Sequence, residues 1–291
     1  MTAAFALVRA VHFLGLMTIF GSEALRALFR ARLKPAPADH LPSWVPTVAA
    51  GAAFATVFFW LDLTAATMSG DRTDLLDPNL LWITLTQTFF GRVAIARAVL
   101  LAALLVSLCW RNAGAIRIAL SGAALAAISL TSHAAASGDA QFMAFRAAND
   151  AVHLLCAAFW IGGLAVLAPL VVAEQKRPGA LVAPLRAFSR WGLAAVSLLV
   201  AAGSLNGYFI LFGGAGRWSL AYLALLAAKI VLAAVMISLA LANRFSLLPG
   251  IDAGHKEAEE TLPLTVVAEL VFGILVIAIV SLLGLLPPRM D

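Results

Sequence analysis

Apolar residues fill almost the whole chain, in blocks that end at charged residues, proline or glycine. Each block holds about 20 residues, which is enough for a helix to cross a hydrocarbon core about 30 Å thick. The pattern predicts eight transmembrane helices, at residues 4–29, 45–68, 90–110, 115–136, 148–173, 191–212, 219–242 and 263–286. A further apolar stretch, residues 80–90, is expected to lie along the membrane surface before the third helix. The predicted fold class is all-α, a polytopic membrane protein.

Composition supports one transmembrane domain that covers residues 1–291. Hydrophobic residues make up 63% of the chain and charged residues only 12%, whereas about 25% of the residues of a soluble domain are charged. Eight spans leave no room for a nucleotide-binding domain, and the sequence has no Gly-x-x-x-x-Gly-Lys-Ser/Thr loop to bind phosphate. It also has neither a nucleophile elbow nor a His-Glu-x-x-His run, so we do not expect an enzyme.

Positive charge is distributed unevenly between alternate loops. Eleven lysines and arginines fall in one set of loops and four in the other. Loops rich in lysine and arginine face the cytoplasm, so both termini are predicted to lie outside it (N-out/C-out). The net charge of +5 therefore reflects membrane topology. Because the basic residues form no continuous face, we expect lipid and not nucleic acid as a partner.

Three histidines lie inside predicted helices: His12, His133 and His153. An ionisable side chain in the bilayer is unfavourable unless it is paired or faces a cavity in the protein. With a rise of about 1.5 Å per residue, all three are expected between roughly 5 and 12 Å from the outer ends of their helices, and Asp62 and Asn206 at similar depth. Imidazole rings from three helices at one depth suit copper, zinc or haem iron. The sequence therefore predicts one metal site of the three histidines near the outer face; the alternative for each alone is a hydrogen bond between helices.

Neighbouring residues are candidates for the same site. Cys156 follows His153 by three residues and so shares a helix face with it. Asp150 precedes His153 by three residues and is a candidate for orienting the ring. Met68 and Met143 are predicted near the outer surface, where soft sulfur suits passage of copper. The sequence leaves open whether any of these residues joins the site.

A second set of charged residues lies deeper in the predicted helices. Glu23 follows His12 by eleven residues, so the two lie on one stripe of the first helix. Arg97, Lys229 and Glu269 also fall inside apolar segments. Lys229 and Glu269 are predicted at compatible depths for a buried pair. Structural ion pairing is the expected role of this set, because unpaired charges are unfavourable in the bilayer.

Several short segments resemble a known family in their order and spacing: VHFLG at residues 11–15, SHAA at 132–135, HLLCAAFWIGGL at 153–164, GSLNG at 203–207, and residues 229–244. The segment from the histidine to Trp-x-Gly-Gly is the most specific. Together they resemble the CopD/PcoD copper-resistance family of bacterial inner-membrane proteins, and the resemblance covers essentially the whole chain.

The resemblance implies a multi-pass inner-membrane protein that imports copper from the periplasm, beside a separate periplasmic CopC-like copper-binding protein. His12, His133 and His153 match the histidines of the family. Two alternatives stay open: a b-type haem redox protein with two axial histidines, and a copper storage or assembly factor without net transport. The oxidation state of copper, the direction and energy source of transport, and the oligomeric state are not determined by the sequence.

Overall fold

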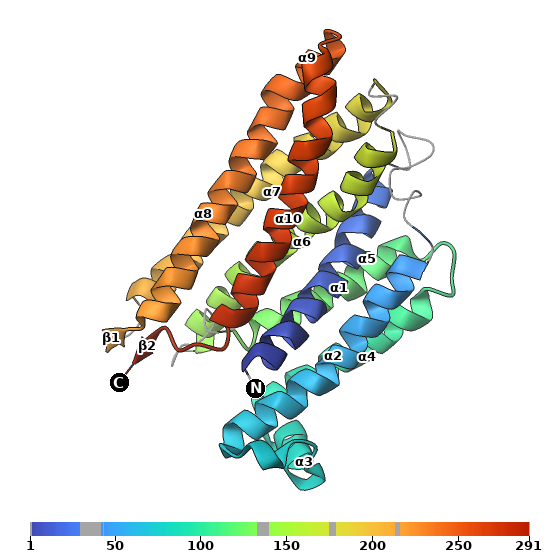
Figure 1. Ribbon diagram of the computed structural model, residues 1–291. Coiled ribbons are helices and arrows are strands. Elements are labelled where there is room, and N and C mark those ends of the chain that lie inside the picture. Colours follow the sequence, from blue (N-terminus) through green and yellow to red (C-terminus); the bar gives the residue numbers. More distant parts are fainter. Residues whose placement is uncertain are drawn as a thin grey trace.

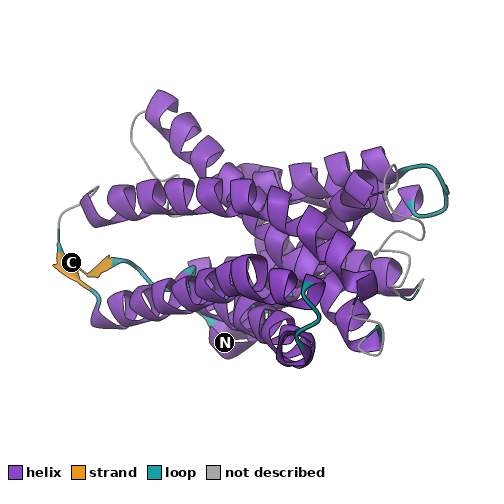
Figure 2. Ribbon diagram, turned by 90° about the horizontal axis from the view of Figure 1, so that it is seen from above, coloured by secondary structure: helices purple, strands orange, loops and turns teal. Residues whose placement is uncertain are grey.

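Long α-helices make up most of the computed structural model, which describes residues 2–29, 42, 44–132, 140–174, 179–212 and 216–290 (Figure 1). The helices are α1 (Thr2–Phe29), α2 (Trp44–Ser69), α3 (Pro78–Gln87), α4 (Phe89–Ser107), α5 (Gly114–Ser129), α6 (Ala140–Ala173), α7 (Gly179–Phe212), α8 (Leu220–Ala242), α9 (Leu248–Asp252) and α10 (Lys256–Leu283). The remaining elements are the 3-10 turn η2 (Arg72–Asp74), the π-helix η4 (Asn243–Leu247) and the antiparallel strands β1 (Arg217–Trp218) and β2 (Arg289–Met290). Figure 2 shows this small strand pair beside the C-terminus.

Seven helical segments in the described part of the chain are long and apolar enough to cross a membrane. They are α1, α2, α4, α6, α7, α8 with its continuation to Asp252, and α10. The apolar α5 is shorter, at 16 residues, and occupies the place of the predicted fourth span. The prediction of an all-α polytopic membrane protein is confirmed. Both termini lie at the same end of the bundle (Figure 1), as an even number of spans requires; eight spans and the N-out/C-out orientation stay predictions.

Three helices begin earlier than the apolar pattern predicts. The structure starts α6 at residue 140, α7 at residue 179 and α10 at residue 256, where the predicted starts were 148, 191 and 263. The extra turns carry polar residues, such as Arg146 and Arg186, which hydropathy assigns to loops. A helix extends beyond the hydrocarbon core without any apolar signal, which explains these differences.

Residues 80–87 of the predicted surface stretch lie in a separate short helix, α3, whereas Phe89 and Phe90 begin α4. The start of α3 is fixed by Asp77, whose side chain accepts hydrogen bonds from the backbone N–H groups of Asn79 (2.8 Å) and Leu80 (3.2 Å). Trp82 and Ile83 are exposed. An exposed apolar face on a short helix is typical of a segment at the membrane interface.

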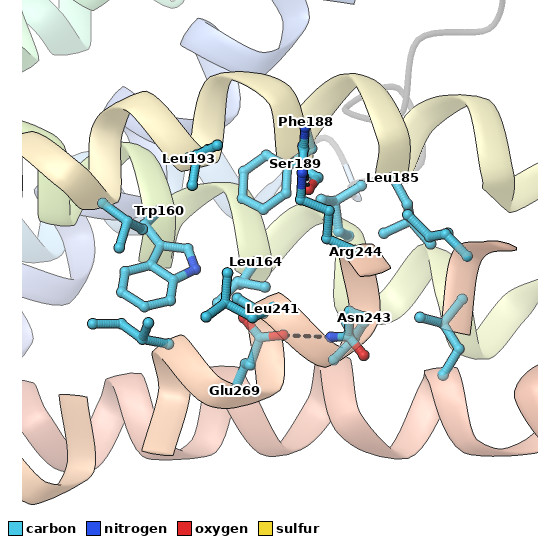
Figure 3. Close-up of a pocket in the computed structure, with 18 of the residues that line it drawn as sticks. Trp160, Leu164, Leu185, Phe188, Ser189, Leu193, Leu241, Asn243, Arg244 and Glu269 are labelled. Atoms are coloured by element: carbon cyan, nitrogen blue, oxygen red, sulfur yellow. Dashed lines mark hydrogen bonds between the residues drawn. The ribbon is translucent and has the colours of Figure 1, made fainter. Parts of the chain in front are cut away.

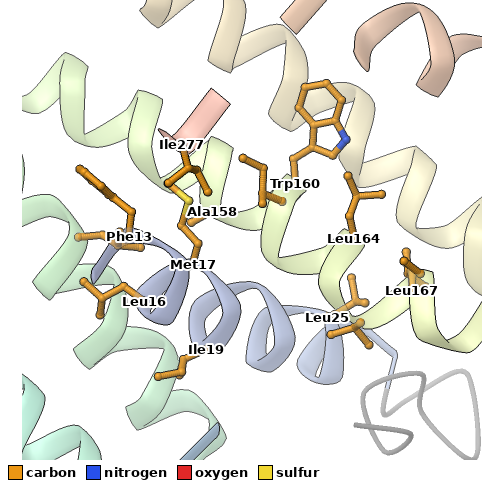
Figure 4. Close-up of a cluster of buried hydrophobic side chains, with 14 of the residues drawn as sticks. Phe13, Leu16, Met17, Ile19, Leu25, Ala158, Trp160, Leu164, Leu167 and Ile277 are labelled. Atoms are coloured by element: carbon orange, nitrogen blue, oxygen red, sulfur yellow. The ribbon is translucent and has the colours of Figure 1, made fainter. Parts of the chain in front are cut away.

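Helix α1 is central and packs against α2, α5, α6 and α10. It meets α6 at two glycines, Gly21 and Gly162, where the backbones touch: a Cβ atom on Gly162 would lie 1.9 Å from the carbonyl oxygen of Met17. Figure 4 shows Met17 beside Ala158 at this contact. Small residues allow such close approach of transmembrane helices. The first glycine of the Trp-x-Gly-Gly segment is therefore required for helix packing.

Candidate metal site

A cavity with several polar residues in a mainly apolar wall lies near the end of the bundle where the termini are found. It has a volume of about 260 Å³ and is bordered by the middle of α6 (residues 150–161), the first turns of α8, the last turns of α7 and α10, and residues of α1, α2 and α5. We call it the histidine cavity. Its polar lining residues include Arg9, Ser132, Asp150, His153, Asn206 and Lys229.

His153 faces this cavity with a defined ring orientation. Its Nδ1 lies 3.0 Å from the carbonyl oxygen of Leu199 on α7. A carbonyl oxygen only accepts, so Nδ1 carries the proton and Nε2 keeps its lone pair, which is the arrangement of a metal-ligating histidine. Gly203 makes room for the ring, because a Cβ atom there would lie 2.8 Å from its Cε1 atom. The GSLNG segment at residues 203–207 therefore makes room for the ring of His153.

Asp150 lies in the same cavity but is held by another partner. Its Oδ1 accepts a hydrogen bond of 2.8 Å from Asn206, whose own Oδ1 accepts from Asn149 at 2.7 Å. Lys229 interacts electrostatically with both Asp150 and His153. The suggested bond between Asp150 and the His153 ring is not present, since Nδ1 of that ring is bound to the α7 backbone. Asp150 instead compensates the charge of Lys229.

His12 is completely buried between α1, α2 and α4, and it is not among the residues that line the histidine cavity. Its Nδ1 lies 3.0 Å from both the carbonyl oxygen of Ala53 and the hydroxyl of Thr56, and its Nε2 accepts from Arg97. Trp60 contacts the ring edge-to-face, with 5.6 Å between centroids, and also lines the cavity. Both ring nitrogens of His12 therefore have hydrogen-bond partners, and Trp60 lies between this ring and the cavity.

Two arginines flank Trp60. The guanidinium carbons of Arg9 and Arg97 lie 4.5 and 4.6 Å from the centroid of its ring. Neither forms an ion pair with a carboxylate in the described residues, and Nε of each is buried without a hydrogen-bond partner there. A cation–π contact contributes about 0.5–2 kcal/mol, which is less than the several kcal/mol that burial of an unpaired ion costs. The ion pairing expected for Arg97 is therefore not found among the described residues, where its hydrogen-bond partner is His12, and Arg9 was not singled out in the sequence.

His133 lies outside the described residues. Ser132, which precedes it in the sequence, lines the histidine cavity. Among the residues that the structure describes, no three of the types His, Cys, Asp and Glu are grouped to hold a metal ion. The three-histidine site therefore stays a prediction: His153 faces the cavity and His12 lies behind its wall.

The other candidate ligands are not among the residues that line the histidine cavity. Cys156 is partly buried and does not line the histidine cavity. Asp62 accepts a hydrogen bond of 2.8 Å from the backbone N–H of Leu76. Met68 and Met143 are exposed. None of these four side chains contributes to the described lining of the cavity.

Comparison with known proteins identifies the family. The model for "Copper resistance protein D-like, N-terminal domain" matches residues 1–143, and the model for "Copper resistance protein D" matches residues 182–283. The chain belongs to the copper resistance protein D family. His12 and His133 lie in the first matched region, and His153 lies between the two.

Curated relatives agree with this assignment. The chain is 29% identical over 288 residues to the inner membrane protein YebZ of Escherichia coli K12, covering 97% of both chains. It is 31% identical over 183 residues to copper resistance protein D of Pseudomonas syringae pv. tomato, covering 59% of this chain and 58% of that protein. It is 41% identical over 64 residues to the copper transport protein CutJ of Bacillus subtilis, covering 21% and 12%. No solved structure matches. This member of the copper resistance protein D family is a multi-pass protein of the bacterial inner membrane.

The deeper charges of this family member form pairs that depth alone did not predict. Glu23, only 2% exposed, accepts from Arg117 at 3.0 Å and Arg26 at 2.6 Å. Structural pairing of Glu23 is thus confirmed. The suggested pairing of Lys229 with Glu269 is wrong, because Glu269 is bound to Asn243 instead.

Glu269 belongs to a second, mostly apolar cavity of about 360 Å³, bordered by α6, α7, α8 and α10 (Figure 3). We call it the glutamate cavity. The carboxylate of Glu269 accepts a hydrogen bond of 2.5 Å from the side chain of Asn243. The Oδ1 atom of Asn243 in turn accepts a hydrogen bond of 2.6 Å from Thr265. Asn243 opens the π-helix η4, a distortion often found at functional sites. In the sequence, this cluster is indicated by Glu269, a carboxylate inside an apolar segment.

Proposed function

We propose that this chain carries copper inward from the extracytoplasmic side and first holds it in the histidine cavity. One observation supports this most: His153, with Nδ1 fixed by Leu199, presents a lone-pair nitrogen in a cavity inside a transmembrane bundle. The cavity lies at the end of the bundle that holds the termini, which the loop charges predict to be extracytoplasmic. The names of two relatives, a copper resistance protein and a copper transport protein, agree with copper as the substrate.

The proposal assigns unequal roles to the three histidines. His153 is the first ligand, because its ring already faces the cavity. His133 is the second, because it follows the cavity-lining Ser132 in the chain. His12 joins only when Arg97 releases its Nε2. A conformational change at α4 would then accompany inward movement of copper. A separate periplasmic CopC-like protein is the proposed donor.

Copper content of purified protein tests the proposal. Wild type and the alanine variants of the three histidines are loaded with copper, desalted and analysed for metal per chain, and copper accumulation is measured in cells that express each of them. The matched control is His255→Ala, which removes an exposed histidine outside the cavity. We expect His153→Ala and His133→Ala to lose copper and His255→Ala to retain it. Unchanged copper content in the alanine variants of all three histidines would contradict the proposal.

The same samples distinguish copper from haem. A haem with two axial histidines needs two imidazoles facing one cavity. In the described lining of the histidine cavity His153 is the one histidine, so a haem there would need His133 as its second ligand. Because we propose copper as the metal, we expect no Soret band in the visible spectrum of the purified protein. A Soret band that disappears in His153→Ala would show that the cavity binds haem and not copper.

A further inference from the structure

Positive charge exceeds negative charge around the histidine cavity. Arg9 and Lys229 line it, and Arg97 lies behind Trp60 at its wall. Asp150 is the one carboxylate in the described lining. Lys229 and Asp150 interact and so compensate each other. The excess charge therefore comes from the two arginines.

No carboxylate in the described residues balances these arginines. Arg97 is 1% exposed, its Nε has no hydrogen-bond partner there, and the charge that acts on it is the like charge of Arg9. Asp62, on the same helix as Trp60, is bound to the backbone of Leu76. A bare copper cation that enters this cavity is repelled by both guanidinium groups, in a medium that screens charge poorly.

An anionic ligand removes this conflict. Guanidinium groups bind carboxylates with paired, charge-assisted hydrogen bonds. Arg9 and His153 both line the cavity, and Arg9 is the arginine in its described lining. A copper chelate keeps exchangeable positions for an imidazole, so a complex in this cavity has a ligand for its metal and a partner for its carboxylates.

We propose that the histidine cavity receives copper as an anionic complex, whose carboxylate groups face Arg9 while the metal faces His153. This inference rests on the proposed function and adds to it the chemical class of the substrate. The unpaired arginines then act as a charge filter that prefers chelated copper over the free cation. Haem also carries carboxylates beside a metal, so the absorption spectrum is needed to separate the two sources of this chemistry.

Three copper(II) complexes of similar size test the charge preference. They are the diethylenetriamine complex, which is doubly positive, the iminodiacetate complex, which is neutral, and the nitrilotriacetate complex, which is singly negative. Each is titrated into purified full-length protein in nanodiscs, and bound copper is measured by equilibrium dialysis. We expect wild type to bind the negative complex at least about tenfold more tightly than the positive one, a difference typical of one charge-assisted contact.

Variants at one position assign the preference to Arg9. Arg9→Gln should remove it, and Arg9→Lys should keep most of it, which also shows that the fold tolerates substitution there. Arg92→Gln, at an exposed arginine on α4, is the matched control and should leave it unchanged.

Equal affinity of wild type for the positive and negative complexes would overturn the inference and leave the proposed function intact. Failure of wild type to bind any of the three would contradict the proposed function and this inference with it. A Soret band in protein that keeps the charge preference would support the carboxylate site and overturn copper as its metal.

Discussion

The histidine cavity and the glutamate cavity share helix α6 but differ in how their polar groups are satisfied. In the glutamate cavity, Glu269, Asn243 and Thr265 bind one another within otherwise apolar walls. In the histidine cavity, Arg9 has no carboxylate partner among the described residues, and His153 keeps a lone-pair nitrogen. A buried network that satisfies itself fixes the structure. Arg9 and the lone pair of His153 are the groups from which we propose a ligand in the histidine cavity.

The two cavities also follow one face of α6. His153 lines the first and Trp160 the second. These residues are seven positions apart, which is about two helical turns and places them on the same stripe. Gly162, on the other side, holds α6 against α1. The position of α6 therefore sets both cavities.

The largest expected effect is on stability, from Gly162→Ala. Alanine normally stabilises a helix relative to glycine, but a Cβ atom here would lie 1.9 Å from the backbone of Met17. We expect a loss of about 3 kcal/mol in the free energy of unfolding, measured by denaturation in detergent. Gly51→Ala is the control, because nothing lies within 4 Å of its Cβ position. Equal stability of both variants would show that α6 does not need this contact.

The next effect concerns the histidine cavity alone. Gly203→Ala places a methyl group 2.8 Å from Cε1 of His153 and so displaces the ring. We expect a tenfold to hundredfold loss of copper affinity, about the size of the effects seen when a ligand loses its support, with folding retained. Gly207→Ala, one turn further along α7, has no atom within 4 Å and should bind copper like wild type. Isothermal titration of copper into both variants checks this prediction. Equal copper affinities of the two variants would show that α7 does not orient the ring of His153.

Most of the fold was predictable from the sequence, whereas the pairing of polar residues was not. Apolar block length predicts the spans because the bilayer sets it. The depth of a residue along a helix does not give its direction around the helix axis. Lys229 and Glu269 were therefore predicted to pair because of their similar depth, whereas Glu269 binds Asn243. His12 is bound by Arg97, a residue 85 positions away on another helix. His153 was singled out because it is a histidine inside an apolar helix, at a depth similar to those of His12 and His133; its role in a metal site stays a prediction.

A smaller effect is expected from Asp150→Asn. The substitution keeps the shape of the side chain but leaves Lys229 without its compensating charge. We expect the affinity for copper(II) ions supplied without a chelator to fall by about tenfold, which corresponds to about 1.4 kcal/mol. Equilibrium dialysis measures it. An unchanged affinity would mean that the charges of this cavity do not act on the metal.

The smallest effect is expected from Glu269→Gln, the same type of change in the other cavity. The amide keeps a hydrogen-bonding group next to Asn243, so stability should change by about 1 kcal/mol or less. Copper affinity should stay within about twofold of wild type, a change well below 1.4 kcal/mol. A large loss of copper binding would assign the metal to the glutamate cavity and reverse the comparison.

X-ray absorption at the copper edge of the loaded protein tests the central claim most directly, because it reports the atoms bound to the metal. We predict imidazole scattering in wild type and in His255→Ala, and loss of the bound copper, and with it of this spectrum, in His153→Ala. A copper spectrum that is identical in wild type and His153→Ala, or that shows only sulfur ligands, would contradict the assignment of copper to the histidine cavity.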